Sequence, residues 1–232
     1  MIAAIIVAAG KGIRMGPNVD KLFLSLNGRP VVAHTWDRFD KASCIDEIIL
    51  VVRDGMQTDF AELAERYQLR KPFRLVPGGK ERQDSVWNGL EAVSSTAEIV
   101  VIQDAARPCT SHALIQSTID AAREVGAAVA AQPVTDTIKE SATGQLIDRT
   151  LDRSHLWAVQ TPQTFRLSVI RQALTEVRRR GISVTDDTAA CELINQPIKL
   201  VLSPEPNPKV TRPDDLPYIE LLLRKTEPGK AR

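Results

Sequence analysis

Two basic residues stand in and just after a glycine-rich segment near the beginning of the chain. The segment AAGKGIRMG, residues 8–16, has three glycines and contains Arg14, and Lys21 follows it closely. Glycines allow backbone N–H groups to approach a ligand and to point at phosphate oxygens. Because a triphosphate carries charge that must be neutralised during phosphoryl transfer, these two cations favour nucleotide binding at this segment.

Other interpretations of the glycine segment remain open from the residues alone. The chain has no GxxxxGK followed by Ser or Thr, as a P-loop requires. A dinucleotide-binding loop needs GxGxxG, whereas the spacing here is GxGxxxG with Arg14 inside. Tyr67 and Lys71 match the Tyr-xxx-Lys spacing of a nicotinamide-dependent oxidoreductase, but they lie outside any glycine-rich context. The plainest alternative is a tight turn with solvated basic residues.

A carboxylate and further basic residues follow other apolar segments. Asp104 comes directly after the run Ile99–Gln103, where it could bind a phosphate-bound Mg²⁺ or cap a helix. Arg107 could hold a substrate phosphate with its planar guanidinium group. Lys209 and Arg212 lie between prolines, which stiffen a loop, just before a helical pattern. Each residue is ambiguous alone, but together they indicate one anion-binding pocket.

The composition restricts the partners and the compartment. Of 232 residues, 43% are hydrophobic and 25% are charged, which is enough for a substantial core. A net charge of +1 and an aromatic content of 4% argue against a nucleic-acid partner. The three cysteines form no CxxC pair and indicate free thiols in a reducing compartment. No run approaches the roughly 20 apolar residues of a membrane span, and the first residues lack the features of a signal peptide. We therefore expect a soluble, cytoplasmic protein with no membrane partner.

Apolar runs alternate with segments of helical spacing along most of the chain. Ile2–Val7 is a continuous, partly β-branched run, as expected for a strand buried on both faces. Strands that alternate with helices imply right-handed crossovers. The sequence therefore predicts an α/β fold with a mainly parallel, Rossmann-like sheet sandwiched by helices. Five further runs have the character of strands: Glu47–Val52, Phe73–Val76, Ile99–Gln103, Ala127–Gln132 and Lys199–Leu202.

The alternation is interrupted at about residues 133–166. Thr137–Glu140 and Gln145–Asp148 flank Gly144 and predict a β-hairpin. Because a hairpin has little core of its own, we expect this arm to pack on a second subunit. The whole chain, with this arm included, is expected to form a single domain over residues 1–232.

Helices are expected between the strands and at the end of the chain. A polar cluster at Thr185–Asp187 could be no more than the start of one of them. The last helix is expected to begin near Thr211, with Pro213 in its first turn and the Asp214 carboxylate at its positive end. The other helical patterns cover residues 31–39, 60–67, 86–93, 114–122 and 167–180.

Seven short motifs occur along the chain in a fixed order. They are AAGKGIRMG with Lys21, PGGKERQDSVWNGL, DAARP, VTDTIKE, DRSHLWAVQTPQTF, VTDD and KVTRPDDL. In this order they resemble the 2-C-methyl-D-erythritol 4-phosphate cytidylyltransferase family of the non-mevalonate isoprenoid route, and the resemblance extends over residues 2–223. The resemblance implies a nucleotidyltransferase that joins CMP from CTP to 2-C-methyl-D-erythritol 4-phosphate. The products would be 4-diphosphocytidyl-2-C-methyl-D-erythritol and pyrophosphate, and Mg²⁺ or another divalent cation would be required.

The resemblance also implies roles for individual residues. Arg14 and Lys21 would stabilise the transition state at the α-phosphorus, and Asp104 would lie near the metal and the substrate hydroxyls. Arg153 and Lys209 are included among the catalytic residues. Thr137 and Arg153 would come from the partner subunit, so that a homodimer completes each site. The groups implied to recognise cytidine are Ala8, Ala9, Gly10, Gly79 and Ser85, and those implied to hold the acceptor are Asp104, Arg107, Thr137, Arg153 and Lys209.

One departure and three rival functions remain. Many members carry Pro-Lys-Gln at the loop lysine, whereas this chain has Asp20-Lys21-Leu22, and Asp20 could divert some of the lysine's charge. A ribitol 5-phosphate cytidylyltransferase would keep the chemistry and change the acceptor. A nicotinamide-dependent oxidoreductase would use the glycine segment for a dinucleotide. A catalytically silent nucleotide-binding module would bind CTP without turnover.

Overall fold

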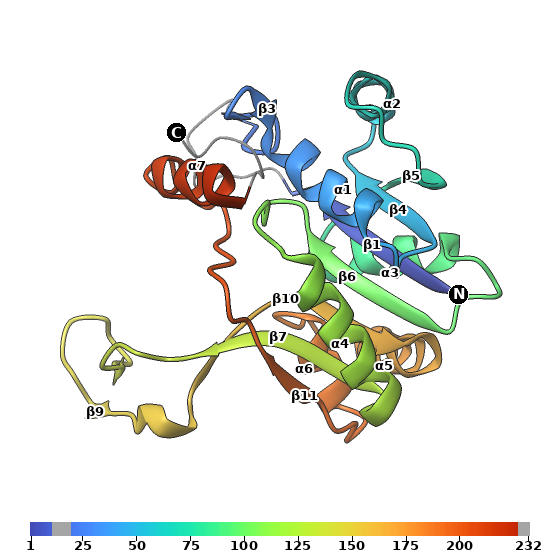
Figure 1. Cartoon of the computed structure of the whole chain (residues 1–232). Coiled ribbons are helices and arrows are strands. Elements are labelled where there is room, and N and C mark those ends of the chain that lie inside the picture. Colours follow the sequence, from blue (N-terminus) through green and yellow to red (C-terminus); the bar gives the residue numbers. More distant parts are fainter. Residues whose placement is uncertain (11–19, 227–232) are drawn as a thin grey trace.

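A seven-stranded mixed sheet forms the centre of the computed structural model, which describes residues 1–10 and 20–226 (Figure 1). The strand order is β11-β7-β10-β6-β1-β4-β5. Strand β1 (Ile2–Ala8) lies between β6 (Ile99–Asp104) and β4 (Glu47–Val52) and is parallel to both. Strand β5 (Phe73–Pro77) extends this parallel part beyond β4. The predicted α/β fold with a mainly parallel sheet is confirmed.

The other half of the sheet contains a strand that the sequence analysis did not identify. Strand β10 (Trp157–Arg166) runs antiparallel to both β6 and β7 (Ala127–Pro133), and β11 (Lys199–Leu202) adds in parallel to β7. The register of β10 shifts between Val159 and Gln163. This irregularity, and the exposure of its first residues, explain why the segment lacks the continuous apolar pattern of the buried strands.

Helices cover both faces of the sheet because successive side chains of each strand point to opposite sides. Ile6 in β1 contributes to one core cluster and its neighbour Ile5 to the other. The first cluster includes side chains of α1 (Val31–Lys41), α2 (Gln57–Arg66), α4 (His112–Val125) and α7 (Asp215–Thr226). The second includes side chains of α3 (Arg82–Ala92), α5 (Leu167–Arg180) and α6 (Asp187–Glu192). A small hairpin, β2 (Ser25–Leu26) and β3 (Arg29–Pro30), precedes α1.

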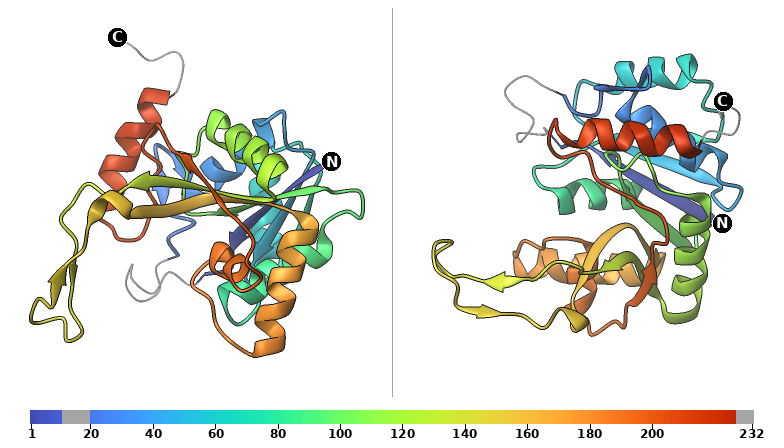
Figure 2. Two further views of the ribbon diagram at one scale, coloured as in Figure 1. Left: turned by 90° about the horizontal axis from the view of Figure 1, so that it is seen from below. Right: turned by 60° about the vertical axis from the view of Figure 1, so that its left-hand side comes forward.

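The arm projects from the sheet between β7 and β10 (Figures 1 and 2). It contains the short antiparallel pair β8 (Lys139–Glu140) and β9 (Arg149–Thr150), followed by a 3₁₀ turn at Arg153–His155. The second arm strand therefore lies later in the chain than the predicted Gln145–Asp148. The arm was predicted over about 133–166, but residues 157–166 belong to β10 in the main sheet, so this boundary is corrected.

The beginning of the last helix is also corrected. Helix α7 begins at Asp215 and not near Thr211. The Asp215 carboxylate accepts hydrogen bonds from the backbone N–H groups of Thr211 and Arg212 at 2.7 and 2.8 Å. Because this first-turn carboxylate binds the preceding loop, residues 211–214 form a turn ahead of the helix. Among the described residues, none of the helices has the length and apolar character needed to cross a bilayer.

Candidate active site

A cleft of about 720 Å³ opens at the carboxyl ends of β1, β4 and β6. Loops that follow parallel strands meet at one edge of the sheet, which is the usual ligand position in open α/β folds. The residues that line this cleft come from separate parts of the chain, from Val7 to Lys209. Of the residues predicted for the site, it brings together Ala9, Gly10, Lys21, Gly79, Ser85, Asp104 and Lys209.

Tightly packed backbone forms the end of the cleft near β1 and α3. A Cβ atom at Gly78 would lie 2.3 Å from the Cβ of Ala9, and one at Gly79 would lie 2.2 Å from the Cβ of Asp84. The Ser85 hydroxyl accepts from the Gly79 N–H at 3.1 Å. Ala8 closes β1 and is 1% exposed, so its neighbour Ala9 is the first residue of this strand's loop to line the cleft. Small residues and backbone groups therefore line this end of the cleft.

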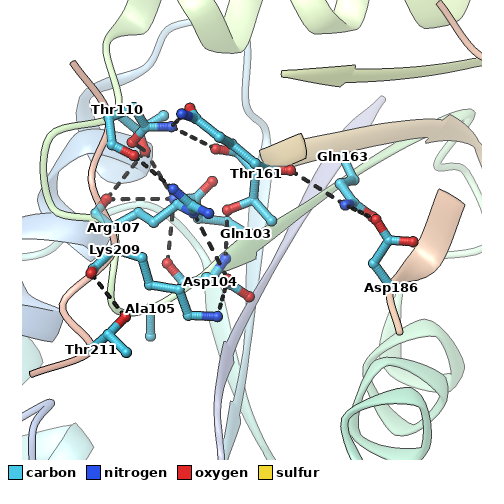
Figure 3. A network of polar contacts seen from close by, with 12 residues as sticks. Gln103, Asp104, Ala105, Arg107, Thr110, Thr161, Gln163, Asp186, Lys209 and Thr211 are labelled. Carbon is cyan, nitrogen blue, oxygen red and sulfur yellow. Dashed lines mark hydrogen bonds and ion pairs between the residues drawn. The ribbon is translucent and has the colours of Figure 1, made fainter. Parts of the chain in front are cut away.

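Asp104 is the centre of a cluster of positive charge (Figure 3). Its carboxylate lies 2.6 Å from the Lys209 ammonium, 3.6 Å from the Nε of Arg82 and 3.8 Å from the Nε of Arg107. Burial alone raises the pKa of the Asp104 carboxyl, but the three cations, Lys209 foremost, hold this pKa below its usual range. Asp104 is therefore ionised at neutral pH, and the cluster keeps an excess of positive charge for anions.

Arg82 also contacts a second, fully buried carboxylate, a pairing that the sequence analysis missed. Its Nη2 lies 2.7 Å from the Oδ2 of Asp187, which is 1% exposed. Burial raises the pKa of the Asp187 carboxyl although Arg82 opposes this, and the two acidic neighbours of Arg82 raise its own pKa against burial. In the sequence, Arg82 and Asp187 stand in the motifs PGGKERQDSVWNGL and VTDD, which marks each residue but does not show that they pair.

The segment that contains Asp187 is attached to β10 by Gln163. The Gln163 side chain donates to the Asp186 carboxylate at 2.9 Å and accepts from the Asp187 N–H at 3.0 Å. Asp186 also caps α6 by accepting from the Ala189 N–H at 2.9 Å. Figure 3 shows Gln163 and Asp186 directed at one another from β10 and the start of α6. The polar cluster at 185–187 is thus both a helix cap and the support of Arg82.

Lys21 and Lys209 converge on the cleft although 188 positions separate them, as expected from the sequence. The Lys21 ammonium donates to the backbone carbonyl of Val210 at 3.2 Å. The N–H of Val210 in turn donates to the carbonyl of Ala106 at 2.8 Å, directly after β6. The loop that contains Lys209 is therefore held between Lys21, which follows β1 in the chain, and the loop that follows β6. Both lysines line the same cavity.

None of the remaining predicted residues is among the described residues that line the cleft. Arg14 falls outside the described residues. Arg107 is 12% exposed in its side chain, and its Nη1 donates to the carbonyl of Asn207 at 2.7 Å. Thr137 and Arg153 are exposed on the arm, where Arg153 donates to the Thr135 carbonyl. A single protomer does not bring these two arm residues into the lining of its own cleft.

A divalent cation fits the cleft only together with a ligand. In the described part of the chain, no group of three or more His, Cys, Asp or Glu side chains is arranged to hold a metal ion. Asp104 is a single carboxylate whose charge is already balanced by neighbouring cations. Mg²⁺ commonly binds through one or two carboxylates and the phosphates of the substrate. The donor set therefore suits an ion that arrives on a triphosphate, and Asp104 is the carboxylate that would hold it.

The parallel sheet, the glycine-lined cleft and the convergent lysines define a nucleotide-binding α/β protein equipped for phosphoryl-group chemistry. The family model described as "IspD: 2-C-methyl-D-erythritol 4-phosphate cytidylyltransferase" matches residues 2–225. The chain belongs to this family.

Similar proteins cover nearly the whole chain. A 2-C-methyl-D-erythritol 4-phosphate cytidylyltransferase of Pelotomaculum thermopropionicum is 42% identical over 224 residues, which span 96% of this chain and 94% of that protein. One of Geobacillus thermodenitrificans is 43% identical over 220 residues, spanning 95% and 96%. The crystal structure of 4-diphosphocytidyl-2C-methyl-D-erythritol synthase from Anaerococcus prevotii has a TM-score of 0.85 at 32% identity and covers 96% of both chains. The crystal structure of the 2-C-methyl-D-erythritol 4-phosphate cytidylyltransferase from Thermus thermophilus has a TM-score of 0.77 at 30% identity. The match covers 97% of this chain and 100% of that one.

Proposed function

We propose that this chain transfers the cytidylyl group of CTP to 2-C-methyl-D-erythritol 4-phosphate. The products are 4-diphosphocytidyl-2-C-methyl-D-erythritol and pyrophosphate, in isoprenoid precursor biosynthesis. The observation that carries the proposal is the convergence of Lys21, Lys209 and Asp104 on one cleft in a chain of this family. A cytoplasmic site of action belongs to the same proposal, and the three free cysteines of the protein support it.

The reaction requires charge stabilisation more than proton transfer. A phosphate oxygen of the acceptor attacks the α-phosphorus of CTP in line, and the bond from that phosphorus to the bridging oxygen of pyrophosphate breaks. A phosphate monoester dianion is a sufficient nucleophile, so no general base is needed. Lys21, with Arg14 in the same proposed role, stabilises the charge that moves onto pyrophosphate. Bound Mg²⁺ would neutralise part of the triphosphate charge, with Asp104 as the residue that holds it.

Lys209 and Arg107 have charges suited to the acceptor phosphate. Lys209 is already directed at the cleft by Asp104, so its ammonium can move to an incoming phosphate over a short distance. The backbone around Ala8, Ala9 and Gly10, with Gly79 and Ser85, would hold the cytidine. Because Gly79 packs too closely against α3 to be replaced by a residue with a side chain, backbone groups line this part of the cleft.

The arm extends the proposal to a homodimer. Thr137 and Arg153 are exposed on the projecting arm (Figure 1), and neither lines the cleft of its own protomer. The arm also exposes two large apolar side chains, Leu146 at 74% and Ile147 at 65%. A second copy of the chain would cover such a surface, and the arm of one protomer would then supply Thr137 and Arg153 to the cleft of its partner.

The test is pyrophosphate release by the purified protein with CTP, Mg²⁺ and either 2-C-methyl-D-erythritol 4-phosphate or ribitol 5-phosphate. We expect turnover with the first alcohol and little with the second. Lys21→Ala should lower turnover by about 10²- to 10³-fold, as the loss of one charge-stabilising donor does in other enzymes. The matched control is Lys41→Ala on α1, whose ammonium pairs with Asp37 at the surface. Preference for ribitol 5-phosphate, or normal turnover of Lys21→Ala, would contradict the proposal.

A further inference from the structure

Asp20 stands directly beside Lys21 and is paired with an arginine from another strand. Its carboxylate forms an ion pair with the guanidinium of Arg53, the first residue after β4. The other carboxylate oxygen accepts from the backbone N–H of Leu22 at 3.1 Å. The two side chains are only 22% and 27% exposed, so solvent screens this pair less than a pair at the open surface.

The same interactions fix the backbone on both sides of Lys21. The carbonyl of Asp20 accepts from the N–H of Phe23 at 3.0 Å and closes a tight turn. Leu22 is 2% exposed, and the ring of Phe23 packs edge-on against Phe60 at 5.4 Å. Lys21 thus lies between a residue tied to β4 and a residue buried in the core. From this support its side chain reaches the Val210 carbonyl across the cleft.

We propose that Arg53 is a positioning residue for Lys21. It ties the turn to the end of β4, and it neutralises the Asp20 carboxylate that would otherwise lower the positive potential around the Lys21 ammonium. The inference rests on the proposed function, because it concerns the charge that Lys21 applies to the triphosphate. Arg53 therefore compensates for the negative charge of Asp20, the acidic residue that this chain has next to Lys21.

A direct contact between Arg53 and the nucleotide is the competing role. Arg53 lines the cleft, and its Nε is buried without a hydrogen-bond partner among the described residues. The two roles differ in what they predict for Asp20. If Arg53 acts by neutralising Asp20, removal of that carboxylate removes the need for Arg53. If Arg53 binds the triphosphate, removal of Asp20 cannot replace it.

The experiment compares the wild type with Arg53→Met, Asp20→Asn and the double variant. We measure kcat and KM with CTP and 2-C-methyl-D-erythritol 4-phosphate, and CTP affinity by calorimetry. Arg53→Met should lower kcat on the order of 10-fold, the effect of one uncompensated charge near a partly buried cation. Asp20→Asn alone should cost less than about 3-fold, since asparagine can still accept from the Leu22 N–H. The double variant should recover to about the level of Asp20→Asn, with the acceptor KM little changed throughout.

A matched control replaces the neighbouring carboxylate. Asp54 lines the same cleft, so Arg53→Met combined with Asp54→Asn should show no comparable recovery. Equal recovery with Asp54→Asn, a double variant as slow as Arg53→Met, or a normal kcat for Arg53→Met would each overturn the inference. If the wild type itself fails to turn over the acceptor, the proposed function fails separately. In that case the CTP affinities of the same variants test the role of Arg53. They should fall in Arg53→Met and recover in the double variant with Asp20→Asn.

Discussion

Removal of Arg82 tests the buried charge network behind the cleft most directly. Arg82→Met leaves the Asp187 carboxylate, which is 1% exposed, without its guanidinium partner. Breaking a buried ion pair costs about 3–5 kcal/mol of unfolding free energy. Because the Arg82 side chain is 29% exposed at the cleft, we expect about 3 kcal/mol, the lower end. For a chain of this size that corresponds to a fall in Tm of roughly 6–12 °C.

The unfolding free energy that Arg82→Met loses should depend on pH in a defined direction. Burial already raises the folded-state pKa of Asp187, and Arg82 is the group that opposes this most. Without Arg82 the folded-state pKa rises further above the unfolded value, so the folded variant takes up a proton more readily than the unfolded chain. Stability is then lost as the pH rises through the folded-state pKa and is regained below it. The penalty of Arg82→Met should accordingly be smaller at pH 5 than at pH 8.

Urea denaturation of the wild type and of Arg82→Met, each at pH 5 and at pH 8, measures these differences in stability. A second variant, Arg82→Met with Asp187→Asn, removes both charges and should recover more than half of the lost stability. The control is Arg179→Met, which breaks an exposed pair with Glu176 on α5 and should change stability little. A penalty equal at both pH values, or one no larger than that of Arg179→Met, would refute the reasoning.

Two further predictions follow from packing and from burial. Gly79→Ala should destabilise the protein by about 1–3 kcal/mol and weaken CTP binding, because a Cβ there would lie 2.2 Å from the Cβ of Asp84. Gly10→Ala is its control in urea denaturation, since nothing lies within 4 Å of a Cβ at that position, and equal destabilisation by both would contradict the packing argument. Burial raises the pKa of Cys109 to about 11 and that of Cys191 to about 12. Both thiols should stay unlabelled by iodoacetamide at pH 8 in the native protein and react after unfolding in urea; mass spectrometry showing rapid native labelling of either would count against their burial.

The sequence by itself determined the parallel half of the sheet and the types of residue that line the cleft: glycines, lysines and a carboxylate. Strands such as Ile2–Ala8 have both faces buried, so their apolar runs are continuous and can be recognised locally. The glycines a few residues before Lys21, and the carboxylate of Asp104 at the end of β6, are also local signals, since the carboxyl ends of parallel strands meet at one edge. The same logic predicted that Lys21 and Lys209 would face one cavity.

Only the tertiary structure decided which charges pair with one another. Arg82 and Asp187 are 105 positions apart, and no local pattern states that a buried carboxylate on α6 will meet the first residue of α3. Asp20 stood beside Lys21 in the sequence, yet its partner is Arg53 from the end of β4. The strand β10 escaped the sequence analysis for a related reason. Its exposed first residues and its register shift interrupt the apolar pattern by which strands are recognised, so that only its pairing with β6 and β7 identifies it.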